Sequence, residues 1–169
     1  NNIAPLRRGE TILIHAATGG SGQAFVEMSQ LPGADIFVTV GNAKKRSFIM
    51  DRFGMAEERI LYTRNMSFAS DVMQLTGGRG ADVIVNYLAG ESLRQSWNCI
   101  TPYGRFVELG QRDITINTRL DMAPFCTKRL LHCVQSGPHS GVRHVSSTRR
   151  PGGGTVAVLS WCTASSWSN

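Results

Sequence analysis

Hydrophobic positions between Gly9 and Gly110 fall into short apolar runs that alternate with longer stretches of helical spacing. The runs are rich in Ile, Val and Leu, as is typical of strands that are buried on both faces of a parallel sheet. In the stretches between them, apolar residues recur every three to four positions, which is typical of amphipathic helices. This alternation predicts a series of β-α-β units around one parallel sheet.

The pattern predicts the following elements. Strands are expected at Thr11–Ala16, Asp35–Val40, Arg59–Tyr62, Asp82–Asn86 and Arg105–Leu109. Helices are expected at Gly22–Leu31, Ala43–Phe53, Ser67–Leu75 and Glu91–Ile100, each followed by Gly or Pro. Because crossovers between parallel strands are right-handed, we expect an α/β, doubly wound parallel sheet of Rossmann type in the order 3-2-1-4-5.

The C-terminal part of the chain has a different composition. Residues 1–121 hold 13 Lys and Arg and all 12 Asp and Glu, whereas residues 122–169 hold five basic residues and no acidic one. Ser, Gly, Thr and Arg dominate beyond residue 134, where Thr155–Leu159 is the one apolar stretch. We therefore expect an N-terminal remnant at 1–8, a Rossmann-type domain at 9–130 and an irregular or disordered tail at 131–169.

Charge and composition argue against several classes of partner. The formal charge of +6 arises mainly in the tail, so no nucleic-acid partner is expected. No apolar run approaches the roughly 20 residues that span a bilayer, so no membrane partner is expected. Four cysteines without a C-x-x-C pair or regular spacing indicate reduced thiols and a cytoplasmic location. No metal site is expected, because the spacing of His132, Cys133, His139 and His144 fits no zinc pattern.

The strongest chemical signal is the segment His15–Gly22, which follows a predicted strand and opens a predicted helix. It has the A-x-G-x-x-G form of the dinucleotide fingerprint, in which Gly19 admits the pyrophosphate and Gly22 lets helix and strand pack closely. Amide groups at the helix start would then point at the phosphates. Ala17 at the first glycine position weakens the match, and a glycine-rich turn without a ligand is the alternative. His15 itself is expected to be a hydrogen-bonded core histidine rather than a base.

The end of the second predicted strand bears on the choice of dinucleotide. An NAD site usually has an acidic residue there to accept the ribose hydroxyls, whereas this chain continues Gly41-Asn42-Ala43-Lys44-Lys45-Arg46. The cations could neutralise a 2′-phosphate, with Arg46 able to bind it through two nitrogens, so the sequence favours NADPH. A solvated basic face is the alternative, although cations at a helix N-terminus oppose the helix dipole.

Taken together, many segments in order resemble one family. They are Ile14–Gln23, Thr39–Gly41, Lys45-Arg46, Arg64–Ala69, Thr76–Gly80, Leu88–Glu91, Gly104–Phe106, Gly110, Arg112–Ile114 and Asp121–Phe125. The chain from Gly9 to about Phe125 resembles the enoylreductase domain of reducing polyketide synthases, and most of all that of fungal highly reducing synthases, within the medium-chain dehydrogenase/reductase superfamily.

The resemblance implies NADPH-dependent reduction of an α,β-unsaturated thioester carried on an acyl carrier domain, without a metal, and a homodimer. It implies that the pyrophosphate lies on the fingerprint turn and the 2′-phosphate near the second strand, with Asn86 and Leu88 beside the nicotinamide. Tyr62 would lie against the adenosine end, or else be a half-buried aromatic at a strand end. The full cofactor-binding set is Ala17, Thr18, Gly19, Gly20, Ser21, Gly22, Gly41, Asn42, Lys45, Arg46, Tyr62, Asn86 and Leu88.

Three departures from the family pattern limit the expected activity. Members carry a substrate-binding half before the nucleotide-binding half, whereas only Asn1–Arg8 precede the first predicted strand. Members commonly carry Lys, a candidate proton donor, where this chain has Gln111, and an amide is not a general acid in the useful pH range. The third departure is the tail, which after about Cys133 has none of the family's expected final strand and helix pattern. As a smaller departure, Tyr87 replaces a small residue between Asn86 and Leu88, where it either crowds the nicotinamide or lies on a surface loop.

These departures lead to the expectation that the chain is an incomplete cofactor-binding half that is inactive alone. A non-catalytic remnant that at most binds nucleotide stays open as an alternative. So does a free-standing quinone oxidoreductase relative, which Arg79-Gly80 and Leu88–Glu91 disfavour.

Overall fold

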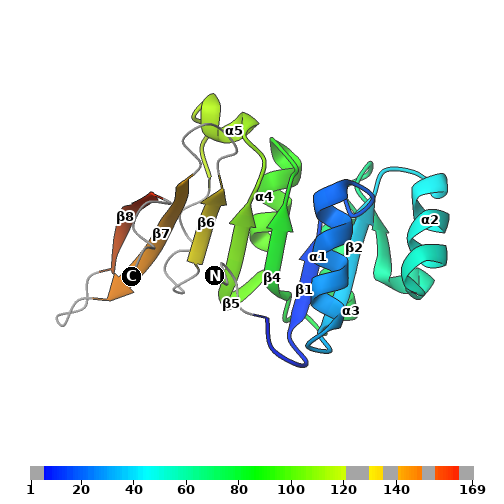
Figure 1. Cartoon of the computed structure of the whole chain (residues 1–169). Helices are drawn as coiled ribbons and strands as arrows, with labels where there is room; N and C mark the ends of the chain where they lie inside the picture. The colour runs from blue at the N-terminus through cyan, green and yellow to red at the C-terminus, as the bar shows by residue number, and fades with distance from the viewer. Residues whose placement is uncertain (1–5, 121–129, 135–140, 150–154, 164–169) are drawn as a thin grey trace.

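The computed structural model describes residues 6–120 in full and the backbone of three later strands, at 130–134, 141–149 and 155–163. Its centre is one sheet of eight strands in the order β3-β2-β1-β4-β5-β6-β7-β8 (Figure 1). Neighbouring strands from β3 to β6 run parallel, and β7 and β8 are added antiparallel. The predicted doubly wound sheet and its order 3-2-1-4-5 are therefore confirmed.

The elements have the following bounds. The strands are β1 (Thr11–Ile14), β2 (Asp35–Val40), β3 (Ile60–Tyr62), β4 (Ala81–Asn86), β5 (Ile100–Glu108), β6 (Leu130–Val134), β7 (Gly141–Arg149) and β8 (Thr155–Thr163). The helices are α1 (Gly20–Gln30), α2 (Ala43–Phe53), α3 (Phe68–Leu75), α4 (Glu91–Asn98) and the short α5 (Arg112–Thr115), with a 3₁₀ helix η1 at Glu57–Arg59. Within the described chain, no helix is both long and apolar enough to cross a bilayer.

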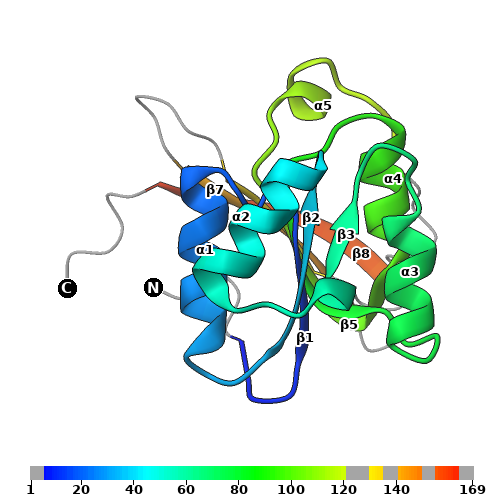
Figure 2. The ribbon, with the colours of Figure 1, turned by 90° about the vertical axis from the view of Figure 1, so that its right-hand side faces the viewer.

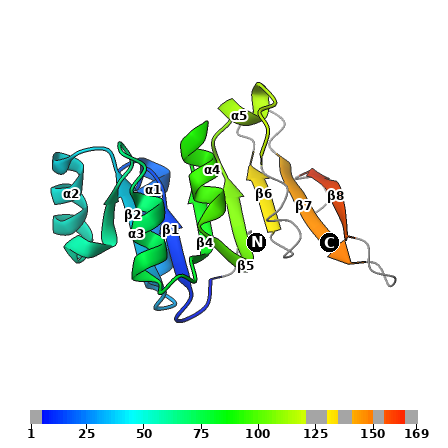
Figure 3. The same ribbon diagram turned by 180° about the vertical axis from the view of Figure 1, so that it is seen from behind.

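Helices cover both faces of the parallel part of the sheet. Figure 2 shows α1 and α2 on one face and α3 and α4 on the other, and Figure 3 shows α3 and α4 from their own side. Two core clusters fill the two interfaces, one with Ile14 beside Val26 and the other with Leu13 beside Trp97. Because successive side chains of a strand point to opposite faces, β1 contributes to both clusters, and all four of its residues are buried.

Element boundaries differ from the predicted ones where the backbone turns. β1 ends at Ile14 rather than Ala16, because Ala16 has a left-handed φ of 52° that no strand accommodates. α1 begins at Gly20, two residues earlier than predicted, with Gly19 as its N-cap. β5 begins at Ile100 rather than Arg105, and its pairing with β4 shifts register between Ala81 and Val83.

Three strands lie beyond residue 129, in the part of the chain where the sequence predicts an irregular tail. β6 begins at the domain boundary expected near residue 130 and extends the parallel sheet beside β5, and β7 and β8 form an antiparallel pair next to it. Ser, Thr and Gly lower the apolar content, but strand pairing uses the backbone groups that every residue except Pro carries in full. Residues 135–140, 150–154 and 164–169 of the predicted irregular tail lie outside the described residues.

A buried histidine joins three elements beneath the β1–α1 turn. His15 directly follows β1 and is 0% exposed. Its Nδ1 lies 2.9 Å from the Thr39 hydroxyl on β2, and its Nε2 lies 2.9 Å from the Ser96 hydroxyl on α4. The Ser96 hydroxyl donates its proton to the Ser92 carbonyl, so its oxygen accepts from Nε2–H and Nδ1 accepts from Thr39. The expected hydrogen-bonded core histidine is confirmed.

Burial lowers the pKa of His15 to about 3, so the imidazole is neutral at physiological pH. The folded state then binds a proton less readily than the unfolded state, in which the pKa of histidine is about 6.5. The stability that depends on neutral His15 is fully present above about pH 6.5 and is lost as the pH falls toward 3, at about 1.4 kcal/mol per pH unit.

We expect His15→Gln, which cannot titrate, to remove this part of the pH dependence. Between pH 7.5 and pH 5.0, the free energy of unfolding of the unchanged chain should fall by about 2 kcal/mol more than that of the variant. Urea unfolding of both proteins at the two pH values measures the difference, in which contributions from the other titrating groups cancel. Equal losses in the two proteins would contradict the buried neutral imidazole.

Candidate functional site

The turn between β1 and α1 is held by backbone contacts. The Gly19 amide donates to the Ala16 carbonyl over 2.9 Å, and the Ala17 amide donates to the Thr39 carbonyl over 3.4 Å. A Cβ on Gly22 would collide with the Ala16 carbonyl oxygen and crowd the backbone of Ala17. Gly22 is therefore required for the close approach of α1 to the end of β1, which is the role that the fingerprint assigns to it.

The N-terminus of α1 presents backbone donors at the carboxyl end of β1. Gly19 is the N-cap, and no side-chain hydrogen bond caps the helix within the described chain. Gly19, Gly20 and Ser21 are exposed, and a Cβ on Gly20 would meet nothing within 4 Å. The first-turn amides and the positive end of the helix dipole together form a site suited to a phosphate group. The residues expected to hold the pyrophosphate thus lie together in the structure.

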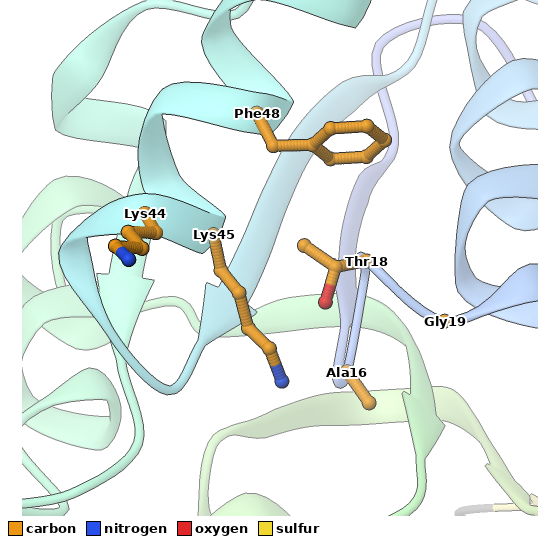
Figure 4. A pocket seen from close by; sticks show the side chains of 6 residues that line it. All are labelled: Ala16, Thr18, Gly19, Lys44, Lys45 and Phe48. Atoms are coloured by element: carbon orange, nitrogen blue, oxygen red, sulfur yellow. The ribbon is translucent and has the colours of Figure 1, made fainter.

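An open pocket of about 510 Å³ lies between this turn and α2. Ala16, Thr18 and Gly19 line it from the turn, and Lys44, Lys45 and Phe48 line it from α2 (Figure 4). In Figure 4 the Lys45 amine extends toward the turn, and the Phe48 ring lies across the pocket from Ala16. The pocket therefore combines cations, an exposed aromatic face and backbone groups.

Asn42 caps α2 and so sets where Lys44 and Lys45 lie relative to the pocket. Its Oδ1 accepts a hydrogen bond of 3.0 Å from the Lys45 amide and so caps α2, which places Lys44 and Lys45 in the first turn. The structure thus gives Asn42 a capping role, and its predicted contact with a 2′-phosphate stays a prediction. Lys44 was predicted only as one of three cations near a 2′-phosphate, and Phe48 was not predicted at all. The available signal was their i, i+4 spacing, which places them on one helix face.

Arg46 and Tyr62, both predicted to bind the cofactor, contact each other rather than line the pocket. The Arg46 guanidinium lies 5.2 Å above the Tyr62 ring, and its Nη1 is 3.4 Å from the Tyr62 hydroxyl. Nη2 donates to the Glu57 carbonyl over 2.9 Å, and Nη1 pairs with the Glu57 carboxylate at 3.1 Å. The cations that line the pocket are therefore Lys44 and Lys45, whereas Arg46 links α2 to η1 through Glu57.

The remaining predicted residues lie at the carboxyl ends of β4 and β5. Asn86 is fully buried, and its Nδ2 donates to the Leu88 carbonyl and to Glu108, both over 2.8 Å. Leu88 packs against the cluster that contains Trp97. Tyr87 is half-buried and packs against the opposite cluster. Gln111 is exposed and precedes α5.

Glu108 is a buried carboxyl group that the sequence did not single out, because it read as part of a strand. It is 5% exposed and pairs in register with Asn86 across β4 and β5. Burial raises its pKa to about 7, against the opposing effect of hydrogen bonds from Asn86 and Gly110, and the charge of Asp113 adds to the rise. Its role could have been predicted only by knowing that Asn86 on β4 lies opposite it in the sheet.

The two groups of residues flank the point where the strand order reverses. β1 lies between β2 and β4, so successive connections leave it in opposite directions along the sheet. In open α/β sheets, ligands bind at the carboxyl ends of the strands at such a point, and a dinucleotide spans both halves. The pocket beside β1 and β2 suits the adenosine part, and the ends of β4 and β5 lie where the other nucleotide would follow. The residues therefore fit a dinucleotide cofactor.

Comparison with known proteins agrees with this geometry. The family model for zinc-binding dehydrogenase matches residues 20–141. The chain is 70% identical over 125 residues to the reducing polyketide synthase PKS1 of Cochliobolus heterostrophus, a match that covers 74% of this chain and 5% of that protein. It is 56% identical over 144 residues to the highly reducing polyketide synthase phiA of a fungal species, covering 82% and 6% respectively. The chain thus spans about one twentieth of these curated relatives.

Among solved structures, one match is to a protein of similar length. The nucleotide-binding subdomain of the enoylreductase domain of PpsC from Mycobacterium tuberculosis is 36% identical, with a TM-score of 0.69, and the match covers 77% of this chain and 71% of that one. The CurK enoyl reductase is 44% identical with a TM-score of 0.58, covering 62% and 30%. The likeness thus extends over most of a nucleotide-binding subdomain.

The family description names zinc, and the described residues do not fit that metal. No three His, Cys, Asp or Glu side chains gather into a possible metal site within the part of the chain whose side chains are described. Both ring nitrogens of His15 are hydrogen-bonded, and burial raises the pKa of the Cys99 thiol to about 12. The cluster His132, Cys133, His139 and His144 lies outside the described side chains.

The sheet order, the fingerprint turn and these matches all lead to one assignment. The described residues form a nucleotide-binding subdomain suited to a nicotinamide cofactor. The chain therefore belongs to the zinc-binding dehydrogenase family of the medium-chain dehydrogenase/reductase superfamily, and within it to the nucleotide-binding subdomains of polyketide-synthase enoylreductase-like domains.

Proposed function

We propose that the chain binds NADPH and serves as the cofactor-binding half of an enoylreductase that reduces an α,β-unsaturated thioester on an acyl carrier domain. The observation that carries the proposal is the pocket between the fingerprint turn and α2, which Lys44 and Lys45 line together with Thr18 and Gly19. Its lining includes two cations and no carboxylate. The curated relatives are reducing polyketide synthases, in which the substrate would be attached to the parent protein.

The preference for NADPH over NADH rests on charge at this pocket. A ribose 2′-phosphate brings about two negative charges, whereas the ribose of NADH brings two hydroxyls that an acidic residue usually accepts. Lys44 and Lys45 occupy the first turn of α2, where the helix dipole disfavours cations unless an anion compensates them. A bound phosphate would supply that compensation.

In the proposed reaction, bound NADPH would supply a hydride for the β-carbon of the thioester, and a proton from another source would reach the α-carbon. The fingerprint turn would hold the pyrophosphate through its backbone amides, and the chain at Asn86 and Leu88 would lie beside the nicotinamide. Gln111 could donate a hydrogen bond to the thioester oxygen as negative charge develops there. Its amide cannot transfer the proton, because it does not ionise in the useful pH range.

We further propose that residues 1–169, as an isolated chain, do not hold the acyl substrate in a reactive position. Hydride transfer requires the β-carbon to stay close to the nicotinamide, and such positioning supplies about 7–11 kcal/mol in the best cases. In the proposal this task falls to a substrate-binding half supplied by the parent protein or a partner module. Proton delivery contributes a further factor of about 10²–10⁴.

We expect the double variant Lys44→Gln and Lys45→Gln to bind NADPH at least about tenfold more weakly, because each charge-assisted contact contributes about 1.5–3 kcal/mol. Affinity for NADH should change less than about twofold. Fluorescence titration of the reduced nicotinamide measures both. Arg52→Gln is the matched control, since it removes a cation at the other end of α2 that pairs with Glu27.

Two outcomes would contradict the assignment to NADPH. One is equal affinity of the unchanged chain for NADH and NADPH. The other is an equal loss of both cofactors in the double variant, which would indicate damage to the pocket rather than loss of a phosphate contact.

We expect the isolated chain to bind NADPH without oxidising it appreciably in the presence of a crotonyl thioester. Gln111→Lys should not restore turnover alone, because it supplies a proton donor but no substrate positioning; it should increase turnover only when a substrate-binding half is added. The loss of NADPH absorbance over time measures turnover for the unchanged chain and for Gln111→Lys, each with and without the substrate-binding half. Rapid oxidation by the isolated chain, abolished by Gly19→Trp, would refute the requirement for a second half, and rapid oxidation with a quinone instead would favour a quinone oxidoreductase.

A further inference from the structure

Two loops meet at the end of the site opposite the cation-lined pocket. One follows β4 and spans residues 87–90, and the other spans residues 109–111 between β5 and α5. A Cβ on Gly110 would lie 3.5 Å from the Tyr87 carbonyl and 3.6 Å from the Leu88 carbonyl. The same Cβ would lie 2.7 Å from Glu108 Oε1, which is closer than side-chain atoms normally approach. The loops therefore touch through backbone, next to the Glu108 carboxylate.

Glu108 joins the two loops through both of its oxygens. Oε1 accepts from the Gly110 amide over 2.6 Å, and Oε2 accepts from Asn86 Nδ2 over 2.8 Å. Asn86 Nδ2 also donates to the Leu88 carbonyl over 2.8 Å, so the carboxylate orients the amide that holds the first loop. Both donors are N–H groups, and they favour the ionised carboxylate, because it is a stronger acceptor at each oxygen than the protonated carboxyl group. We call this arrangement the Glu108 clamp.

The neighbouring charges leave the clamp carboxylate without a described cationic partner. Asp113 on α5 is the charge that acts on it, and it disfavours ionisation. Desolvation acts to raise the pKa of Asp113, but hydrogen bonds from Thr118 and the Gly90 amide, with Arg94 and Arg112 nearby, lower it overall. Asp113 therefore stays ionised near neutral pH and accepts a hydrogen bond of 2.9 Å from the Gly90 amide, which joins the first loop to α5.

We propose that Glu108 is a positioning residue that, when ionised, holds the loops around the nicotinamide end of the cofactor, and that its protonation loosens them. The proposal rests on the proposed function, because it assumes that a nicotinamide nucleotide binds across β1. Protonation removes the charge and adds an O–H donor to one oxygen of the clamp, so the hydrogen bond from either Gly110 or Asn86 is weakened. If the Asn86 amide rotates to accept the new proton, the Leu88 carbonyl loses its donor instead. The raised pKa of Glu108 places this change near neutral pH.

The clamp lies at one end of the site only, and this gives a specific expectation. The adenosine pocket is built from the β1–α1 turn and α2, and neither contributes to the clamp. Protonation of Glu108 should therefore weaken ligands that carry the nicotinamide and leave shorter ligands unaffected. The pair NADPH and 2′-phospho-ADP-ribose differs by the nicotinamide alone, and both carry the same titrating 2′-phosphate. Comparing the pH dependence of their affinities therefore separates protonation of Glu108 from protonation of the 2′-phosphate.

The test is the dissociation constant of each ligand at pH 8.5 and pH 6.0, measured by calorimetry on the 169-residue chain. We expect the affinity for NADPH to fall about three- to tenfold more than that for 2′-phospho-ADP-ribose, as loss of one hydrogen bond implies. Glu108→Gln mimics the protonated state and should show the weaker NADPH affinity at both pH values, with unchanged affinity for the shorter ligand. Glu58→Gln, which removes an exposed carboxylate from η1, should behave as the unchanged chain.

Other outcomes would contradict either the clamp or the proposed function. Parallel pH dependence of the two ligands in the unchanged chain overturns the clamp, and this comparison needs no variant to fold. A Glu108→Gln protein that keeps the NADPH-specific pH dependence also overturns it. If both ligands bind and only the clamp expectation fails, the proposed function stands. If neither ligand binds, the proposed function fails and the clamp proposal fails with it.

Discussion

The close approach of α1 to the end of β1 is the constraint on which the rest of the site depends. Gly22 leaves no room for a Cβ beside the Ala16 carbonyl, so the helix begins directly above the strand. The left-handed backbone at Ala16 and the amide contacts of Ala17 and Gly19 follow from this geometry. His15, bonded to β2 and α4, supports the turn from beneath. The amides at the helix start are thus fixed before any ligand arrives, which reduces the ordering that binding requires.

The two ends of the site differ in how they handle charge. At the end beside α2, Lys44 and Lys45 are exposed and line the pocket, so their contribution to binding depends on the charge of the ligand. At the other end, Glu108 is buried and satisfied by N–H groups of the chain itself. A carboxylate in that setting costs desolvation free energy, which its hydrogen bonds offset in part. The site therefore has exposed positive charge at one end and, at the other, a buried carboxyl group whose ionised and protonated forms have similar free energies near neutral pH.

The sequence predicted the parallel sheet and its order because both follow from local signals. Buried strands of Val and Ile, helix caps and the fingerprint spacing each act within a few residues, and the handedness of crossovers supplies the order. It could not predict where Arg46 lies, because Glu57 and Tyr62 attract it from separate elements. Nor could it find Glu108, whose role depends on register with Asn86. Beyond residue 129, pairing of β6, β7 and β8 with the sheet edge uses backbone groups, which leave little trace in composition.

The locked imidazole of His15 offers a spectroscopic consequence. Its Nε2 proton is buried, and the two partners fix a single neutral tautomer. Such a proton exchanges slowly with solvent, and the two ring nitrogens of a fixed tautomer have well-separated nitrogen resonances. Because His15 directly precedes the turn that would bind the phosphates, its ring signals report whether that turn is intact. The folding of the cofactor site can thus be followed by nuclear magnetic resonance without adding any ligand.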